Sequence, residues 1–320
     1  MDLDILCIGP AGFDIFISGK DLKPNKLLIE NSITLENNTS YDIDHSVYEA
    51  GGAGLNASIV FARQGILAGC MAKTGKDHLA NQIKIIAKHE NIETDTFINK
   101  PEHHTDMNIH IVTNRTDEIR LAYENSNNSL RPKEVKLPKL QSKMIYFAEL
   151  PDDFKIFKYY ASWAKINQSK LVVNITDFKK YKKRHINYII STSSTVMIKK
   201  QLAIDYWNIE EGDLGSIEAV NNFGANSIVM YDVIDKAYAF ENGTLYMSGP
   251  YKKTNPLDLT GADDVFAAGY ISAIFSQKSV PEALTLASAN ACSVMDIFGT
   301  RTGILKKPAL RTMKVETRTL

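Results

Sequence analysis

NPLDLTGADDVFAAGY, residues 255–270, joins a Gly-Ala turn and two adjacent aspartates to the start of an apolar helix. The helix continues as VFAAGYISAIF, residues 265–275, which is apolar on all sides and is therefore predicted to be buried. When such a helix follows a strand in an open α/β sheet, its first turn lies at the sheet edge where these folds bind ligands. The stretch thus predicts an α/β fold with a ligand site near residues 260–264.

The turn in this stretch suits an anion. Thr260, Gly261 and Ala262 can leave main-chain N–H groups pointing outward, and the helix dipole adds partial positive charge. A carboxylate there repels a bound phosphate unless it takes part in chemistry, and the useful task is that of a general base. In the alternative interpretation Asp263 or Asp264 simply caps the helix, which is worth about 1 kcal/mol. The motif alone leaves both interpretations open.

Two further turns carry polar residues that could meet a ligand. In GGAGLNA, residues 51–57, the glycines allow close approach of the backbone, and Asn56 offers both a donor and an acceptor. In GPAGFD, residues 9–14, the first predicted strand ends in a turn that presents Asp14. Each could also be an ordinary turn, the first with an asparagine cap.

Apolar runs alternate with helical periodicity along the chain. This rhythm indicates right-handed crossovers and a mostly parallel sheet covered by helices. The predicted strands are 4–9, 67–72, 144–147, 171–174, 188–190 and 227–231, and the predicted helices are 57–64, 79–89, 154–166 and 216–223.

Two segments break this rhythm. Residues 15–49 are polar with a tendency to strand, and residues 104–124 form two alternating strands around an Asn-Arg-Thr-Asp turn. We expect them to pair as a small separate sheet, and two unrelated surface insertions are the alternative.

Composition restricts the classes of function. Lys plus Arg equals Asp plus Glu at 37 each, a balance that does not favour binding to nucleic acid. The three cysteines have neither the spacing of a disulfide framework nor that of a zinc site. The N-terminal segment is not typical of a signal peptide, and no apolar run is long enough to span a bilayer. A soluble cytoplasmic protein is expected, with no nucleic acid or membrane partner.

In combination and in this order, the motifs resemble the ribokinase-like, or phosphofructokinase-B, family of sugar and nucleoside kinases. GGAGLNASIVFARQG, residues 51–65, is similar to the family's N-terminal signature, and LDLTGADDVFAAGY, residues 257–270, is similar to its C-terminal signature. AKTGKDHLANQIKIIAKHENIETDTF, residues 72–97, and ALTLASANACSVMDIFGTRTG, residues 283–303, fit the same pattern. The resemblance extends from about residue 4 to residue 303.

The resemblance implies a three-layer α/β/α domain with a mostly parallel central sheet and a small β-sheet lid. The large domain would comprise residues 1–14, 50–103 and 125–320, and the lid residues 15–49 and 104–124. Family members also form dimers through the lid, so a homodimer of this kind is an open expectation.

The implied reaction is transfer of the ATP γ-phosphoryl group to a hydroxyl of a small sugar or nucleoside, with Mg²⁺ and, by analogy, a monovalent cation beside Asp258. Asp264 matches the family's general base. The remaining implied positions are Gly261, Ala262 and Asp263 in the anion hole, Asp14, Gly51, Gly52 and Asn56 for the acceptor, and Thr260, Asn290 and Gly299 for the nucleotide.

Four departures from the family pattern concern the nucleotide side. Asp263 stands where the family has glycine, and Leu259 replaces a threonine. The Asn-x-x-Glu motif that helps to organise Mg²⁺ is expected near residues 191–197, which are STSSTVM, and a glycine-bearing loop is expected near residues 231–236, which are YDVIDK. The metal ligands are therefore not identified by the sequence.

The acceptor residues of the family pattern are thus present, whereas the nucleotide residues are altered, and two functions follow from this difference. The first is an active ATP-dependent kinase with a divergent nucleotide site, and the second is a catalytically weak or inactive protein of the same fold that binds a small molecule as a sensor. For the acceptor, a sugar or sugar phosphate is placed slightly ahead of an adenosine-like nucleoside. Phe13 could stack on a base or belong to the core.

Overall fold

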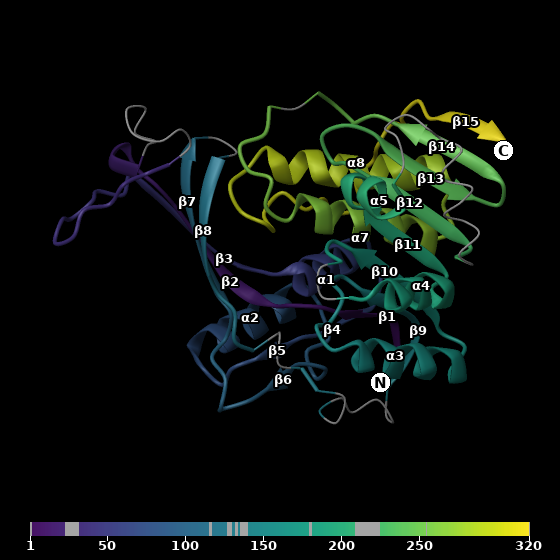
Figure 1. Cartoon of the computed structure of the whole chain (residues 1–320), viewed down its shortest axis with the longest axis horizontal. Coiled ribbons are helices and arrows are strands. Elements are labelled where there is room, and N and C mark those ends of the chain that lie inside the picture. Colours follow the sequence, from purple (N-terminus) through teal and green to yellow (C-terminus); the bar gives the residue numbers. More distant parts are fainter. Residues whose placement is uncertain are drawn as a thin grey trace.

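The computed structural model describes residues 2–22, 32–114, 117–126, 130, 131, 134, 140–178, 181–208, 225–253 and 255–319. The helix predicted at residues 216–223 lies outside the described residues. In the rest of the chain, the predicted alternation of strands and helices produces a mixed α/β fold with one large, mostly parallel sheet and a small separate sheet (Figure 1).

The central sheet has nine strands in the order β15-β14-β13-β12-β11-β10-β9-β1-β4. The strands from β4 to β12 in this order run parallel, and β13, β14 and β15 are antiparallel additions at one edge. Their bounds are β1 (Asp2–Ile8), β4 (Ala68–Met71), β9 (Gln141–Phe147), β10 (Lys170–Ile175), β11 (Thr195–Lys199), β12 (Ser227–Tyr231), β13 (Ala237–Glu241), β14 (Thr244–Ser248) and β15 (Glu316–Thr319).

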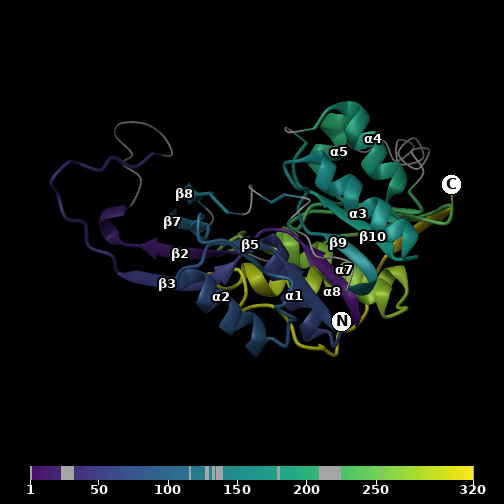
Figure 2. The ribbon, with the colours of Figure 1, turned by 90° about the horizontal axis from the view of Figure 1, so that it is seen from below.

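Helices cover both faces of this sheet. Figure 2 shows α3, α4 and α5 on one side and α1, α7 and α8 on the other, so the large domain has three layers. Two hydrophobic clusters lie between these layers, one for each face. The bounds are α1 (Ala53–Arg63), α2 (His78–His89), α3 (Phe154–Ile166), α4 (Lys183–Thr192), α5 (Lys200–Trp207), α7 (Ala262–Phe275) and α8 (Val280–Met295).

The sequence prediction was wrong at residues 188–190. These residues belong to α4 and not to a strand. The apolar run is part of the pattern Ile186, Ile189 and Ile190, whose spacing of three and four residues puts all three side chains on one buried helix face. The parallel strand expected there is β11, seven residues further on, where Val196, Met197 and Ile198 are buried on both faces of the sheet.

The small sheet contains four strands in the order β3-β2-β7-β8 and projects from one end of the large domain (Figure 1). Its strands are β2 (Gly12–Ser18), β3 (His45–Gly51), β7 (Met107–Asn114) and β8 (Asp117–Tyr123). Thus β2 starts three residues before the boundary predicted at residue 15, and β3 leads directly into the glycine motif. Two short strands, β5 (Lys73–Thr74) and β6 (Ile98–Asn99), and one 3-10 turn, η1 (Lys20–Leu22), complete the elements.

The helix predicted from VFAAGYISAIF is α7, which is buried along nearly its whole length. It packs between α1 and α8, since apolar residues on every side require neighbours on every side. This packing brings the first turn of α7 beside the first turn of α1. Within the described part of the chain, no helix is both long and apolar enough to cross a membrane.

Candidate active site

The first turns of α1 and α7 join the two signature motifs. Asn56 Nδ2 donates a hydrogen bond to Asp264 Oδ2 at 3.1 Å, across 208 residues of sequence. Asn56 is buried, and its amide oxygen Oδ1 has no hydrogen-bond partner among the described residues. A buried acceptor without a partner is unfavourable unless a ligand supplies the donor. A ligand hydroxyl that donates a hydrogen bond to Asn56 Oδ1 would therefore be stabilised beside this pair.

The environment of Asp264 changes its acidity. Burial raises the pKa of Asp264 to about 7, the hydrogen bond from Asn56 lowers it, and the nearby charge of Asp263 raises it further. A carboxyl group with a pKa near 7 is divided between its acid and base forms at neutral pH. Such a group, lining a cavity, is suited to accept a proton.

Asp263, the residue that departs from the family pattern, forms an ion pair with Lys199. Lys199 is the last residue of β11, so its side chain reaches the helix end from the neighbouring strand. Both side chains are about one-third exposed, at 39% for Lys199 and 30% for Asp263. The ion pair offsets the negative charge that Asp263 brings to the turn. Lys199 was not among the predicted site residues, and it lies two residues beyond the segment 191–197 where the Asn-x-x-Glu motif was expected.

The turn before α7 has the backbone conformation that a glycine permits. Gly261 precedes the helix with φ of +76°, in the left-handed region. No side chain caps the helix, although two aspartates stand in its first turn. The capping interpretation is therefore not what the structure adopts. Of the three main-chain donors predicted for the anion hole, the N–H of Ala262 is engaged by Leu259 O at 3.1 Å.

A cavity of about 500 Å³ lies above these two helix ends, between the central and small sheets. It collects most of the sequence-predicted residues. Its lining includes Asp14, Gly52, Asn56, Thr260, Gly261, Asp263 and Asp264. Gly51, Ala262, Asn290 and Gly299 are not in the lining. The lining also contains residues that no sequence motif indicated, among them Asn108, His110, Arg120, Glu124, Glu149, Thr176, Asp177, Lys199 and Thr300.

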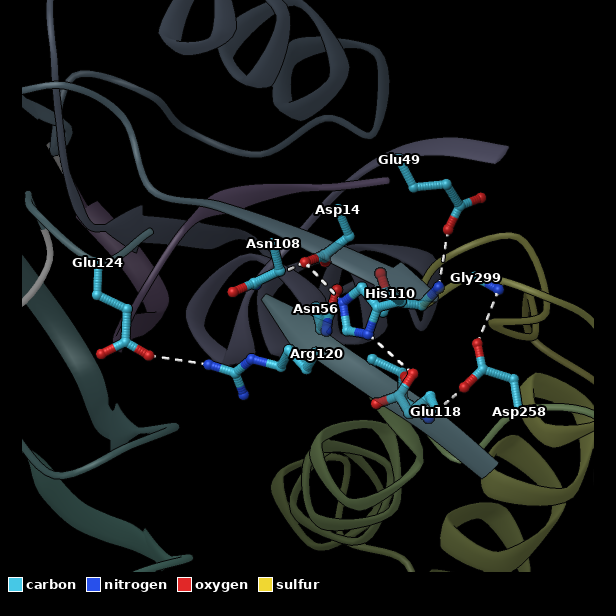
Figure 3. Close-up of polar contacts among 12 residues, drawn as sticks. Asp14, Glu49, Asn56, Asn108, His110, Glu118, Arg120, Glu124, Asp258 and Gly299 are labelled. Carbon is cyan, nitrogen blue, oxygen red and sulfur yellow. Dashed lines mark hydrogen bonds and ion pairs between the residues drawn. The ribbon is translucent and has the colours of Figure 1, made fainter. Parts of the chain in front are cut away.

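The small sheet contributes a linked set of charges to the cavity (Figure 3). Asp14 on β2 accepts hydrogen bonds at Oδ1 from Asn108 Nδ2 at 2.7 Å and from His110 Nε2 at 3.4 Å. The other ring nitrogen of His110, Nδ1, lies 2.9 Å from Glu118 Oε2 on β8. The alternation of Asn108 and His110 along β7 was the available signal, because residues two apart on a strand face the same side.

Gly51 is close to this set even though it does not line the cavity. A Cβ atom at Gly51 would lie 2.2 Å from Asp14 Oδ2 and 2.8 Å from Thr300 Oγ1. No side chain fits there without displacing Asp14. Gly52 has φ of +94°, and a Cβ there would lie 2.7 Å from Pro10 O. The two glycines thus give room to Asp14 and to the turn at Pro10.

Two buried carboxylates organise the loop after α8. Glu49 Oε2 on β3 accepts hydrogen bonds from the main-chain N–H groups of Thr300 at 2.8 Å and Arg301 at 3.0 Å. Asp258 Oδ2 accepts one from Gly299 N at 3.1 Å, and its Oδ1 accepts one from Thr260 N at 2.8 Å. Burial raises the pKa of Asp258 even though these hydrogen bonds lower it. Gly299 therefore holds the loop in position beside the site.

Asn290 has a different environment from that predicted. It is fully buried in α8, its Nδ2 donates to Leu286 O at 3.2 Å, and its Oδ1 accepts from Leu305 N at 3.0 Å. Both ends of the amide are therefore engaged by main chain, and the side chain anchors the segment after the loop.

Comparison with known proteins gives a consistent result. Residues 21–307 match the pfkB carbohydrate kinase family. Among solved structures, the nucleoside kinase of Methanocaldococcus jannaschii is 17% identical with a TM-score of 0.77, and the match covers 94% of each chain. Arabidopsis thaliana ribokinase, complexed with ribose and ATP, is 14% identical with a TM-score of 0.76, covering 96% of this chain and 97% of that one. A putative ribokinase II from E. coli, in complex with ATP and Mg²⁺, is 11% identical with a TM-score of 0.77, covering 95% and 96%. At these identities the likeness establishes the fold.

Proposed function

Because this chain belongs to the pfkB family of carbohydrate kinases, we propose that it transfers the γ-phosphoryl group of ATP to a hydroxyl of a sugar or nucleoside, with Asp264 as the general base. The observation that carries this proposal is the setting of Asp264, which lines the cavity of about 500 Å³, bonds to Asn56 and has a pKa of about 7. A base is most effective when its pKa lies near the operating pH.

In the proposed reaction Asp264 accepts the proton of the attacking hydroxyl. Asn56 holds Oδ2 of the carboxylate, which leaves Oδ1 for that proton. The N-terminus of α7 has no side-chain cap, so its partial positive charge would stabilise the negative charge of the transferring group. Lys199 would add a full positive charge on the same side.

Asp14 and Asn56 would bind the acceptor. The Oδ1 of Asp14 is engaged by Asn108 and His110, and the Oδ1 of Asn56 has no partner among the described residues. Oδ2 of Asp14 and Oδ1 of Asn56 could thus accept hydrogen bonds from a ligand. An acceptor with neighbouring hydroxyl groups provides such donors.

The lining of the cavity favours a sugar over a nucleoside. In the described part of the chain, the lining contains neither Phe, Tyr nor Trp on which a base could stack. Phe13, the residue considered for that purpose, packs against the hydrophobic core. A polar cavity of this kind suits a polyhydroxyl compound.

ATP and Mg²⁺ are compatible with the residues present. ATP supplies the phosphoryl group and Mg²⁺ reduces its charge; magnesium in kinases is commonly held by one or two carboxylates together with the phosphates. Glu149 and Asp177 line the cavity and have the required chemistry, although no group of three metal-binding side chains occurs among residues that the structure describes. The predicted monovalent cation fits less well, because both carboxylate oxygens of Asp258 already accept main-chain N–H groups. The proposed reaction does not include it.

The small sheet would act as the lid of the site, closing over acceptor and nucleotide to exclude water. Its edge strands β3 and β8 carry exposed apolar side chains, Tyr48, Leu121 and Tyr123. Pairing of two such edges would cover them in a homodimer. Analytical ultracentrifugation of the wild-type protein beside a Tyr48→Lys, Leu121→Lys variant tests the proposed dimer. A wild-type protein that sediments as a monomer, with the same coefficient as the variant, contradicts it.

A second candidate is a small-molecule binding or sensor protein with weak or absent turnover. Asp263 favours this alternative, since it brings a negative charge to the helix turn that would receive the phosphates. Such a protein would keep the acceptor contacts of Asp14 and Asn56 and would bind ATP weakly.

One experiment separates the two functions. ADP release is measured with unphosphorylated sugars, sugar phosphates and adenosine, beside calorimetric titration of ATP and of each acceptor. The kinase predicts ADP release that depends on acceptor and falls at least about a hundredfold in Asp264→Asn. Acceptor binding without ATP binding or ADP release would establish the sensor instead.

A further inference from the structure

His110 occupies the centre of the small sheet and is only 2% exposed. It lies on β7, between β2 and β8, and Figure 3 places its ring between the carboxylates of Asp14 and Glu118. The site chemistry proposed above does not use it. A buried titratable group at the edge of a ligand cavity calls for a role of its own.

The two carboxylates determine the protonation of the ring. Nδ1 of His110 is 2.9 Å from Glu118 Oε2, and Nε2 is 3.4 Å from Asp14 Oδ1. An ionised carboxylate can only accept, so both ring nitrogens must donate, and only the imidazolium has two N–H groups. Burial lowers the pKa of His110, but the hydrogen bonds to Asp14 and Glu118 outweigh it and raise that pKa to about 9.

The plane of the ring is fixed as well. Phe16 on β2 stacks on His110 with a centroid separation of 4.4 Å and an interplanar angle of 14°. A cation on an aromatic face is stabilised when both are away from water. Asp14 and Phe16 on β2 and Glu118 on β8 therefore hold the ring together, with the two carboxylates at opposite ring nitrogens.

This arrangement orients the carboxylate of Asp14. Its Oδ1 accepts from both His110 and Asn108, whereas its Oδ2 points toward Gly51, where a Cβ atom would approach to 2.2 Å. Two donors on one oxygen fix the rotation of the carboxylate, and the imidazolium places a positive charge beside it. The oxygen that remains can only accept hydrogen bonds.

We propose that His110 is a positioning residue for acceptor binding, whose imidazolium, held by Glu118, orients Asp14 as a carboxylate that selects hydroxyl donors. This inference rests on the proposed function in that the hydroxyls belong to the acceptor. It adds that Glu118 on β8, which contacts His110 but not Asp14, contributes to the specificity of Asp14.

The test separates binding from chemistry. The variants are His110→Gln, which can donate only to one side, and Glu118→Gln, with His45→Gln, at the exposed start of β3, as the matched control. For His110→Gln, KM and the calorimetric Kd of the acceptor should rise about 10- to 100-fold, the usual effect of a lost hydrogen bond to a charged group. The kcat should change little, because Asp264 and Asn56 are not touched. Equal Kd values in His110→Gln and wild type would overturn the inference.

A measurement without ligand keeps the inference distinct from the proposed function. In ¹⁵N spectra of the wild-type protein, the ring nitrogens of His110 should both have imidazolium shifts from pH 6 to pH 8, and the Asp14 carboxyl carbon should shift in His110→Gln. A neutral ring, or an unchanged Asp14 resonance, overturns the inference whatever the enzyme's turnover. Absence of ADP release with both signatures present overturns the kinase and leaves the positioning of Asp14 in place.

Discussion

Lys199, at the end of β11, forms an ion pair with Asp263, in the first turn of α7. The family pattern implies a glycine at position 263, and this pairing explains how a carboxylate is accommodated there. The negative charge that would face the phosphates is matched by a positive charge from the adjacent strand.

Replacement of Lys199 by Met should therefore weaken ATP binding. The change leaves Asp263 without its counter-charge and removes a cation that lowers the pKa of Asp264. We expect KM for ATP to rise about tenfold, as for other charge-assisted contacts. Lys200→Met is the matched control, because Lys200 pairs with Asp235 outside the cavity. Equal KM values for ATP in the two variants would contradict the proposed role of Lys199.

Asp263→Gly should have the opposite effect. Removing the carboxylate relieves repulsion of the nucleotide and lowers the pKa of Asp264, since Asp263 is one of the charges that raise it. ATP affinity measured by calorimetry should increase. Because the two side chains form one pair, Lys199→Met should cost less in the Asp263→Gly background than in wild type. Strict additivity in this double-mutant cycle would show that the pair does not act on ATP.

Catalysis should depend on pH through Asp264. The base must be ionised, so kcat/KM should rise with pH and level off above the pKa of about 7. Loss of activity on acidification should follow a single ionisation, and it should shift to lower pH in Asp263→Gly. A profile that is flat between pH 5.5 and pH 8.5 argues against Asp264 as the base.

The same carboxyl group should affect stability in the reverse direction. The pKa of Asp264 is raised in the folded state from 3.8 to about 7, so the folded protein binds more protons than the unfolded chain between these values. The free energy of unfolding contributed by this group therefore falls as pH rises through that window. Asp264→Asn should raise Tm relative to wild type at pH 8 and differ less at pH 4. Thermal unfolding at the two pH values provides the measurement.

The fold could be predicted from the sequence because its signals are local. Apolar runs such as 227–231 and the helical spacing of 154–166 match β12 and α3 residue for residue. The error at 188–190 arose because Tyr188 to Ile190 form an apolar run too short to distinguish a strand from a buried helix face. The antiparallel strands β13 and β14 were not predicted as strands.

The site was predictable only in part. Residues within a motif, such as Asp264 and Asn56, could be identified, whereas Lys199, His110 and Glu49 contribute through contacts across more than 60 residues of sequence. Nothing near Lys199 in the sequence indicates Asp263 as its partner. Asn290 illustrates the opposite case, because a polar residue in a matching segment proved to be engaged by the main chain on both sides.

Gly51→Ala should disrupt acceptor binding without altering the first turns of α1 and α7. The new methyl group would lie 2.2 Å from Asp14 Oδ2 and must displace it. We expect a rise in acceptor KM of at least about tenfold if the hydrogen bond to the charged Asp14 is lost. Gly249→Ala is the control, because a Cβ atom there meets nothing within 4 Å. Normal acceptor affinity in Gly51→Ala would exclude Asp14 as a binding residue.

Glu49 has a consequence for how the site could open. Its buried carboxylate ties β3 to the main chain of Thr300 and Arg301, and separating them would leave a charge and two N–H groups unsatisfied. The base of the small sheet is therefore bound to the large domain at Glu49. We therefore expect β3 near Glu49 to keep its position when a ligand binds, and any movement of the small sheet to be larger at residues 45–48, which lie further along β3 from this contact.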